Sequence, residues 1–353
     1  MNPTTQLQSY TGQSVYVGID VHKRTYAVVT RVNQREEKRW TTVAEPKKLG
    51  QQLHKFFPGA EIYSAYEAGF SGFGLHRELM SQGITNIVVH AAAIEVAANN
   101  RVKTDKRDAR KIAEQLEAGR LRGIRIPTES QESARLLSRT RSQLVYQRTQ
   151  TQNCIRMKAH QFGLISADDR RRMSHKLVKD LLEESHSEAF CCTVMSHHQV
   201  WKTLDEEIKQ LEAQLKEQAA SDPYEETYRS VPGVGFISAR ILANELGDLS
   251  QFANERQLFS YIGLTPAEYS SGENTRRGSI TKQGNRQVRS ILIEVAWRAI
   301  REDGSLSAYY EQLKGRRGSK RVIVAVVRKL IGRIRAAFRD QVLYQIEEVE
   351  AVA

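Results

Sequence analysis

Apolar and polar residues follow a strand-like pattern near the amino terminus of the chain. Apolar side chains cluster between Ser14 and Val32 around a polar break at residues 22–24, which predicts two strands joined as a hairpin. Periodicity along the following residues predicts an α/β region. Its further elements are a strand over Lys38 to Val43, a helix over Pro46 to Phe57, a strand over Ala60 to Tyr66, a helix over Gly72 to Ser81, a strand over Asn86 to His90 and a long helix over Ala92 to Ala118.

A glycine-poor stretch rich in Gln, Arg, Glu and Lys runs from Gln131 to Asp222 and is predicted to be helical almost throughout. Within it, apolar residues alternate spacings of three and four, as in a short heptad pattern. This pattern predicts a coiled-coil hairpin or a dimer contact, with an ordinary amphipathic helix packed on its own domain as the alternative. The seam residues are Trp201, Leu204, Ile208, Leu211 and Leu215.

Changes in composition divide the chain into three regions. The first, residues 1–125, has the element order βββαβαβα, which is that of an RNase H-like domain. The second, residues 126–222, is the helical, coiled-coil region. Glycines return after Asp222-Pro223, so the third region, residues 223–353, is a separate and mainly helical domain. The predicted fold class is therefore α/β plus α.

Charge and composition narrow the class of partner. The 353 residues include 53 Lys and Arg against 41 Asp and Glu, giving a net charge of +12 and a pI near 9.6, which favours a polyanion such as nucleic acid. Three cysteines imply no disulfide framework, and neither a signal peptide nor a membrane span is evident. We therefore expect a cytoplasmic, nucleoid-associated protein. Cys191 and Cys192 with His197 and His198 could suggest zinc, but adjacent ligands fit one tetrahedral ion poorly, so packing is favoured.

Four acidic residues of the first region lie where metal ligands are expected. Asp20 and Glu67 each end a predicted strand, while Asp105 and Asp108 lie three apart on one face of a predicted helix. Carboxylates that lie this close together repel one another unless cations lie between them. Magnesium (Mg²⁺) prefers such hard oxygen ligands. We predict that these four residues hold magnesium for phosphodiester chemistry. The alternative for each is a solvated surface acid.

The third region contains a second candidate site. The turn Val231 to Gly235 resembles the hairpin of a helix-hairpin-helix element, whose glycines and helix amino terminus can approach phosphates. Ser270, Ser271 and Ser279 lie in a basic, glycine-containing stretch and are equal candidates for a nucleophile. The alternative is a phosphate-binding loop in which serine only donates a hydrogen bond. The predicted nucleic-acid contacts are Lys103, Lys106, Arg107, Gly233, Gly235, Arg276, Arg277, Lys282, Asn285 and Arg289.

These motifs, taken in order, resemble the DEDD-type insertion-sequence transposases, the bridge-RNA-guided serine recombinases related to the Piv invertases. The resemblance implies a RuvC-like amino-terminal domain with a magnesium-binding DEDD set and a carboxy-terminal transposase domain with a nucleophilic serine. It selects Ser271, and it implies homodimers or homotetramers that pair donor and target DNA through a guide RNA. The matching motifs are Gly18 to Lys23, Glu67 to Gly69, Lys103 to Ala109, Val231 to Gly235, Gly263 to Pro266, Ser271-Gly272 and Lys282 to Asn285. Gly69 departs from the family's usual threonine.

The leading hypothesis is a DNA recombinase in which Ser271 forms a covalent phosphoserine linkage and the strand is rejoined elsewhere. The alternatives are a metal-dependent nuclease or junction resolvase without that linkage, and a non-catalytic nucleic-acid scaffold. Basic surfaces near the carboxy terminus would hold nucleic-acid backbones, although we expect the apolar run Val322 to Val327 to pack in the core.

Overall fold

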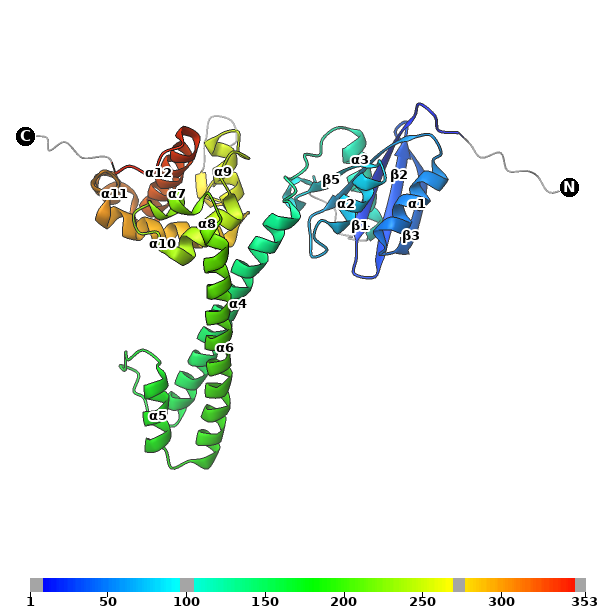
Figure 1. Cartoon of the computed structure of the whole chain (residues 1–353). Helices are drawn as coiled ribbons and strands as arrows, with labels where there is room; N and C mark the ends of the chain where they lie inside the picture. Colours follow the sequence, from blue (N-terminus) through cyan, green and yellow to red (C-terminus); the bar gives the residue numbers. More distant parts are fainter. Residues whose placement is uncertain (1–8, 96–104, 269–276, 347–353) are drawn as a thin grey trace, which may run out of the picture. The chain divides into compact units, whose positions relative to one another are not determined.

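The computed structural model describes residues 9–95, 105–268 and 277–346 (Figure 1). The chain divides into two compact units, one up to Ile126 and one from Pro127 onward. The helical middle and the carboxy-terminal helices fall in the same unit. The division into three domains stays a prediction.

The first unit is built on a five-stranded sheet with the order β3-β2-β1-β4-β5. Strands β1, β2 and β3 are antiparallel neighbours, whereas β4 pairs parallel with β1, and β5 pairs parallel with β4. The strands span Ser14–Val21 (β1), Thr25–Val32 (β2), Arg35–Val43 (β3), Glu61–Glu67 (β4) and Thr85–Val89 (β5). The mixed α/β prediction and the order of its strands and helices are confirmed.

Helices cover both faces of this sheet. Helices α1 (Pro46–Phe56) and α2 (Gly74–Ser81) share a core with Val17 and Ile19 of β1. Helix α3 (Asp105–Glu117) packs on the other face, where Ala109 and Ala113 form a small cluster with Val29. Successive residues of a strand point to opposite faces, so the alternation along β1 determines which helices each side chain contacts.

The predicted long helix over Ala92 to Ala118 is wrong at its beginning. Residues Ala91–Ala93 form only a 3₁₀ turn (η1), followed by extended backbone at Ile94. The His90 side chain accepts a hydrogen bond from the Ala92 N–H, which favours the short turn at this point. The structure describes helix again from Asp105.

The second unit begins with a long helical hairpin, the arm, formed by α4 (Glu129–Gln161) and α6 (Glu188–Ala220), with α5 (His175–Glu184) between them in sequence (Figure 1). Arg141 of α4 pairs with Glu212 of α6. Seven residues later in α4, Arg148 pairs with Asp205, which lies seven residues earlier in α6. The helices are therefore antiparallel neighbours, which supports the coiled-coil hairpin. Helix fills most of the stretch that was predicted to be helical almost throughout, and a break begins near Gly163, whose left-handed backbone follows the end of α4.

The remaining helices enclose one apolar core. Val322, Val326 and Val327 are buried, which confirms that the apolar run of the last helix packs inside the protein. A short antiparallel pair, β6 and β7, was not predicted. The elements are α7 (Glu225–Arg229), α8 (Phe236–Leu246), α9 (Glu255–Ile262), β6 (Pro266–Glu268), β7 (Arg277–Ile280), α10 (Arg286–Glu302), α11 (Gly304–Arg317) and α12 (Ser319–Asp340). In the described ranges, no helix has both the length and the apolarity needed to cross a membrane.

Candidate functional site

Asp20 and Glu67 occupy neighbouring positions on two parallel strands. Ile19 of β1 pairs with Tyr66 of β4, so the next residue of each strand, Asp20 and Glu67, lies at the same level. Adjacent strands lie about 4.8 Å apart, and residues at the same level of a parallel pair point to the same face. The sheet therefore brings these two carboxylates to one edge, as the sequence predicted.

Gly18 allows helix α3 to lie almost on the backbone of β1. A Cβ atom at Gly18 would lie 2.0 Å from the Ala109 carbonyl oxygen and 2.5 Å from the Ala113 nitrogen. Further back along β1, Tyr16 pairs with Arg31, and the Arg31 Nε donates to Glu117 at 2.7 Å. Helix α3 therefore runs opposite to β1, and its first turn, beginning at Asp105, lies toward the edge where β1 and β4 end.

Two of the three described carboxylates, those of Asp20 and Asp108, have local partners. The Asp20 Oδ2 lies 3.2 Å from the His22 Nε2, and the Asp108 Oδ1 lies 3.2 Å from the Lys111 Nζ, while Glu67 is exposed. The side chains of Lys103, Asp105 and Lys106 lie outside the described part of the chain. Among the side chains that are described, no three His, Cys, Asp or Glu residues gather closely enough to hold a metal ion.

The fit to magnesium therefore depends on the donor chemistry and on the backbone. Carboxylate oxygens are the ligands that magnesium prefers, and a rigid strand pair fixes the Cα positions of Asp20 and Glu67. The other two acids of the predicted set, Asp105 and Asp108, fall in the first turn of α3, whose backbone is directed to the same edge. The four-residue ligand set is compatible with this arrangement and stays a prediction. Arg107, the described member of the predicted basic rim here, is exposed on α3.

The turn between α7 and α8 gives its two glycines different surroundings. Gly233 has a left-handed backbone with φ of 77°, and a Cβ there would lie 2.5 Å from the Arg298 Cβ and 3.2 Å from the Ala299 nitrogen. This glycine thus permits contact with α10. Gly235 precedes α8 at its N-cap and has open space around its Cα, so it is the glycine that a phosphate could approach.

The β6–β7 pair forms the stem of a hairpin in the predicted serine region. Ser270, Ser271 and Arg276, and the side chain of Arg277, lie outside the described residues. Ser279 of β7 and Lys282 are exposed. Backbone bonds hold the stem: the Thr281 N–H donates to the Thr265 carbonyl, and the Lys282 N–H donates to the Gly263 carbonyl.

Two predicted nucleic-acid contacts have partners inside the protein. Arg289 is 9% exposed, and its Nη1 donates to the Ile262 carbonyl at 2.6 Å. Burial lowers the pKa of its guanidinium. The contact with the Ile262 carbonyl caps the end of α9, and it is this use of the buried side chain that disfavours the predicted role in binding nucleic acid. Asn285 accepts from the Val288 N–H as the N-cap of α10, and its Nδ2 donates to Glu245 at 2.8 Å.

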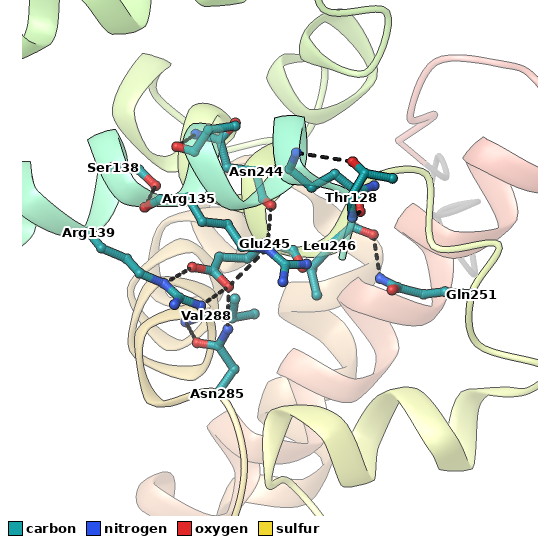
Figure 2. Close-up of polar contacts among 12 residues, drawn as sticks. Thr128, Arg135, Ser138, Arg139, Asn244, Glu245, Leu246, Gln251, Asn285 and Val288 are labelled. Carbon is teal, nitrogen blue, oxygen red and sulfur yellow. Dashed lines mark hydrogen bonds and ion pairs between the residues drawn. The ribbon is translucent and has the colours of Figure 1, made fainter. Parts of the chain in front are cut away.

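Glu245 is a functional candidate that sequence reasoning missed (Figure 2). Its side chain is fully buried on α8, and Arg139 of α4 binds both of its carboxylate oxygens, at 2.7 and 2.9 Å. Arg135, one turn earlier on α4, donates to the Asn244 and Glu245 carbonyls at the end of α8. The sequence feature that could have identified Glu245 is its place as an acid within the apolar stretch of α8, because a buried acid needs a partner.

Two family profiles match this chain. Residues 17–162 match DEDD_Tnp_IS110, described as a transposase, and residues 225–311 match the profile described as "Transposase IS116/IS110/IS902 family". The first profile covers most of the α/β unit and all of α4, and the second covers the region from α7 into α11 that contains the serine stretch.

Individual relatives extend across most of the chain. "Putative transposase y4qE" of Sinorhizobium fredii is 33% identical over 294 residues, which cover 81% of this chain and 72% of the relative. The transposase for insertion sequence element IS1111A of Coxiella burnetii is 29% identical over 72% of this chain and 71% of its own. The transposase for insertion sequence element IS1533 of Leptospira borgpetersenii is 27% identical over 93% of this chain and 96% of its own.

Proposed function

Because the chain belongs to the IS110 family of insertion-sequence transposases, enzymes that cut and rejoin DNA, we propose that it does so through a covalent phosphoserine intermediate at Ser271. The observation that supports the metal-dependent part of this proposal is the placement of Asp20 beside Glu67, with the first turn of α3 directed to the same edge. The choice of Ser271 rests on its basic, glycine-containing sequence and on the resemblance to the family. An RNase H-like, RuvC-like fold for the first unit is part of the proposal, as is the relation to serine recombinases and Piv invertases.

Asp20, Glu67, Asp105 and Asp108 would hold magnesium. When bound, magnesium supplies positive charge that offsets the negative charge on the phosphate undergoing substitution. The chain's own contribution is to fix the carboxylates by strand pairing and by the close approach of α3 to Gly18. The His22 Nε2 lies 3.2 Å from the Asp20 Oδ2 and limits the space in which that carboxylate can move.

Ser271 would act as the nucleophile. Its hydroxyl gives up a proton, its oxygen bonds to phosphorus, and the bond from phosphorus to a deoxyribose oxygen breaks, with that oxygen taking up a proton. A second strand's hydroxyl then attacks the phosphoserine and releases the serine, so the number of phosphodiester bonds is conserved. Exposed Lys282 and the basic residues Arg276 and Arg277 in the adjoining sequence suit the added negative charge at phosphorus.

The partners in this proposal are donor DNA, target DNA and a guide RNA, the bridge RNA, that selects both by base pairing. The net charge of +12 supports binding to nucleic-acid backbones, with Lys103, Lys106, Arg107 and Gly235 as contacts. A homodimer or homotetramer acting on the nucleoid completes the proposal.

The decisive experiment incubates the protein with its co-purifying RNA, labelled DNA and magnesium, and looks for a protein–DNA adduct that survives denaturation. We expect an adduct in the wild type that Ser271→Ala abolishes, while Ser270→Ala and Ser279→Ala retain it. An adduct that persists in Ser271→Ala would contradict the assignment. DNA cleavage with no adduct in the wild type would favour the metal-dependent nuclease.

The metal assignment has its own test. Asp20→Ala or Asp105→Ala should abolish strand exchange while the circular dichroism spectrum and RNA binding stay close to those of the wild type. Full strand exchange in either variant would refute the predicted ligand set.

A further inference from the structure

We propose that Glu245 is a positioning residue that ties the arm helix α4 to the stem of the β6–β7 hairpin and thereby orients the hairpin for strand exchange. This inference rests on the proposed function, because that hairpin adjoins the proposed nucleophile. Glu245 acts through the residues that it positions and does not itself contact DNA or the reacting serine.

Glu245 gathers donors from two other helices (Figure 2). Arg139 of α4 binds both carboxylate oxygens, and Arg135 lies 3.8 Å from the Oε2. Asn285, the residue immediately before α10, donates from its Nδ2 to the same Oε2 at 2.8 Å. A fully buried carboxylate with these partners has little freedom to rotate, so it holds the three helices at a defined spacing.

Asn285 connects Glu245 to the hairpin stem, so that the fixed position of the carboxylate also fixes the stem. Its side chain caps α10, and its backbone N–H donates to the Tyr261 carbonyl at 2.9 Å at the end of α9. The preceding loop fits against α9 without room for side chains: a Cβ at Gly284 would lie 2.2 Å from the Tyr261 oxygen, and one at Gly263 would lie 2.4 Å from the Gln283 oxygen. The loop then leads directly back into β7, so the position of Asn285 sets that of the stem.

The other end of the link is the arm. The guanidinium of Arg135 donates to two carbonyls at the end of α8, and Gln287 in the first turn of α10 donates to the Ser142 hydroxyl of α4 at 2.7 Å. Three successive turns of α4 therefore contact α8 or α10. Any displacement of α4 along its axis would pull on Glu245 and Asn285 together.

Stability alone does not require an ionic link at this place. Glu245 is fully buried while the Arg139 side chain is 52% exposed, so the carboxylate bears most of the desolvation cost. Replacing a buried ionic contact by apolar residues of similar volume is often neutral or stabilising, because that cost is removed. An apolar pair would fill the space, but it would not offer Asn285 an acceptor. This difference separates a positioning role from a packing role.

The test compares the double variant Glu245→Leu/Arg139→Met with the matched control Arg141→Met/Glu212→Leu, which removes an Arg–Glu pair between α4 and α6. Both are studied as full-length chains with RNA and DNA. We expect thermal midpoints within about 3 °C of the wild type for both. Only the Glu245 variant should show at least tenfold faster hydrogen exchange in peptides covering residues 277–288, and at least a tenfold lower rate of adduct formation.

A single variant guards against misfolding of the double one. Asn285→Ser keeps a good N-cap residue on α10 but is too short to reach Glu245, so it should produce the same two changes, faster exchange in residues 277–288 and slower adduct formation. Glu245→Gln keeps one acceptor oxygen and should retain more exchange protection than Glu245→Leu.

Wild-type exchange protection in either the double variant or Asn285→Ser would overturn the inference, as would a wild-type rate of adduct formation in the double variant. Failure of the proposed function has a different signature, an adduct that persists in Ser271→Ala. The exchange measurement still decides the role of Glu245 in that event, because it does not depend on the chemistry.

Discussion

Gly18 lies where α3 crosses β1, and a Cβ at this position would lie 2.0 Å from the Ala109 carbonyl oxygen. Real Cβ atoms do not approach backbone oxygens this closely, so any other residue requires the helix and the strand to separate. The same crossing sets the height of α3 above the sheet, and with it the distance from the first turn of α3 to Asp20. The absence of a side chain on glycine at position 18 thus contributes to the geometry of the proposed metal site.

We predict that Gly18→Ala lowers the free energy of unfolding of the first unit by roughly 1–3 kcal/mol, the usual cost of overpacking, and strongly reduces magnesium-dependent strand exchange. Urea denaturation and the adduct assay would measure the two effects. Gly74→Ala is the control, because Gly74 begins α2 with nothing within 4 Å of an added Cβ. Wild-type stability and activity in Gly18→Ala would show that α3 is not held at this distance.

Asp303 and Tyr344 form a buried pair at the other end of the chain. Asp303 is fully buried, accepts from the Tyr344 hydroxyl at 2.8 Å and pairs with Arg333 at 3.1 Å. Burial and the hydrogen bond to Asp303 raise the pKa of Tyr344 from 10.0 to about 12, although Arg333 acts in the opposite direction. The folded state therefore favours the protonated phenol.

This shift predicts a stability loss in alkali. A folded-state pKa above the unfolded value gives stability that is complete below about pH 10 and is lost as the pH rises toward about 12. The slope from one such group is at most about 1.4 kcal/mol per pH unit. Denaturation of the wild type and of Tyr344→Phe at pH 9, 10 and 11 would measure this contribution of Tyr344 to stability. The difference in unfolding free energy between the two proteins should shrink as the pH rises. A constant difference would refute the linkage.

At the scale of elements, the arm is held at its α5 end by an apolar cluster centred on Trp201. The indole is 3% exposed and shares its core with Ile155 of α4 and Leu177 of α5. The His175 ring stacks on it at 4.3 Å, and the His175 Nε2 lies 3.1 Å from Asp205, which in turn pairs with Arg148. Three helices thus meet at one side chain.

We predict that Trp201→Ala destabilises this end of the arm by roughly 3–5 kcal/mol, since it leaves a large cavity. Hydrogen exchange should become faster in peptides from α5 and from the adjoining half of α6. The neighbouring Val200→Ala serves as the control, because Val200 is 51% exposed and its truncation should change stability by no more than about 0.5 kcal/mol. Equal exchange in the two variants would mean that Trp201 does not organise the arm.

The elements that the sequence predicted correctly are those with a long periodic pattern. The strands of the first unit and the apolar run of α12 have enough residues for periodicity to be clear. Strands β6 and β7 have only three and four residues, which are too few to show a periodic pattern. The error at Ala92 has a different cause, because alanine favours helix while a local bond from Ala92 to His90 favours a turn.

The same limit applies to the candidate site. Asp20 and Glu67 were predictable because each ends a strand, and strand ends of a parallel pair meet at one edge. Glu245 was not, because its partner Arg139 is 106 residues away in the sequence and on a different helix. Arg289 was misleading, since its basic neighbours suggested a phosphate contact while its guanidinium bonds to a backbone carbonyl inside the protein. Sequence patterns give faces and edges, whereas long-range polar pairs require the tertiary structure.

At the scale of the whole molecule, the proposed metal ligands and the proposed nucleophile belong to different compact units, on either side of Pro127. One polypeptide could supply both to a site, or two protomers could each supply one. In a symmetric dimer with shared sites, each site takes its carboxylates from one protomer and its serine from the other. The two possibilities make opposite predictions for mixtures of inactive variants.

We predict that co-expressed Asp20→Ala and Ser271→Ala chains regain activity that neither has alone. Random pairing would make half of the dimers mixed, each with one intact shared site, so adduct formation should return to about a quarter of the wild-type level. The adduct should form only on the Asp20→Ala chain, which retains its serine, and a size tag on one variant would identify it by electrophoresis. A mixture as inactive as its components would place carboxylates and serine of one site in the same chain, because a mixed dimer then contains no complete set.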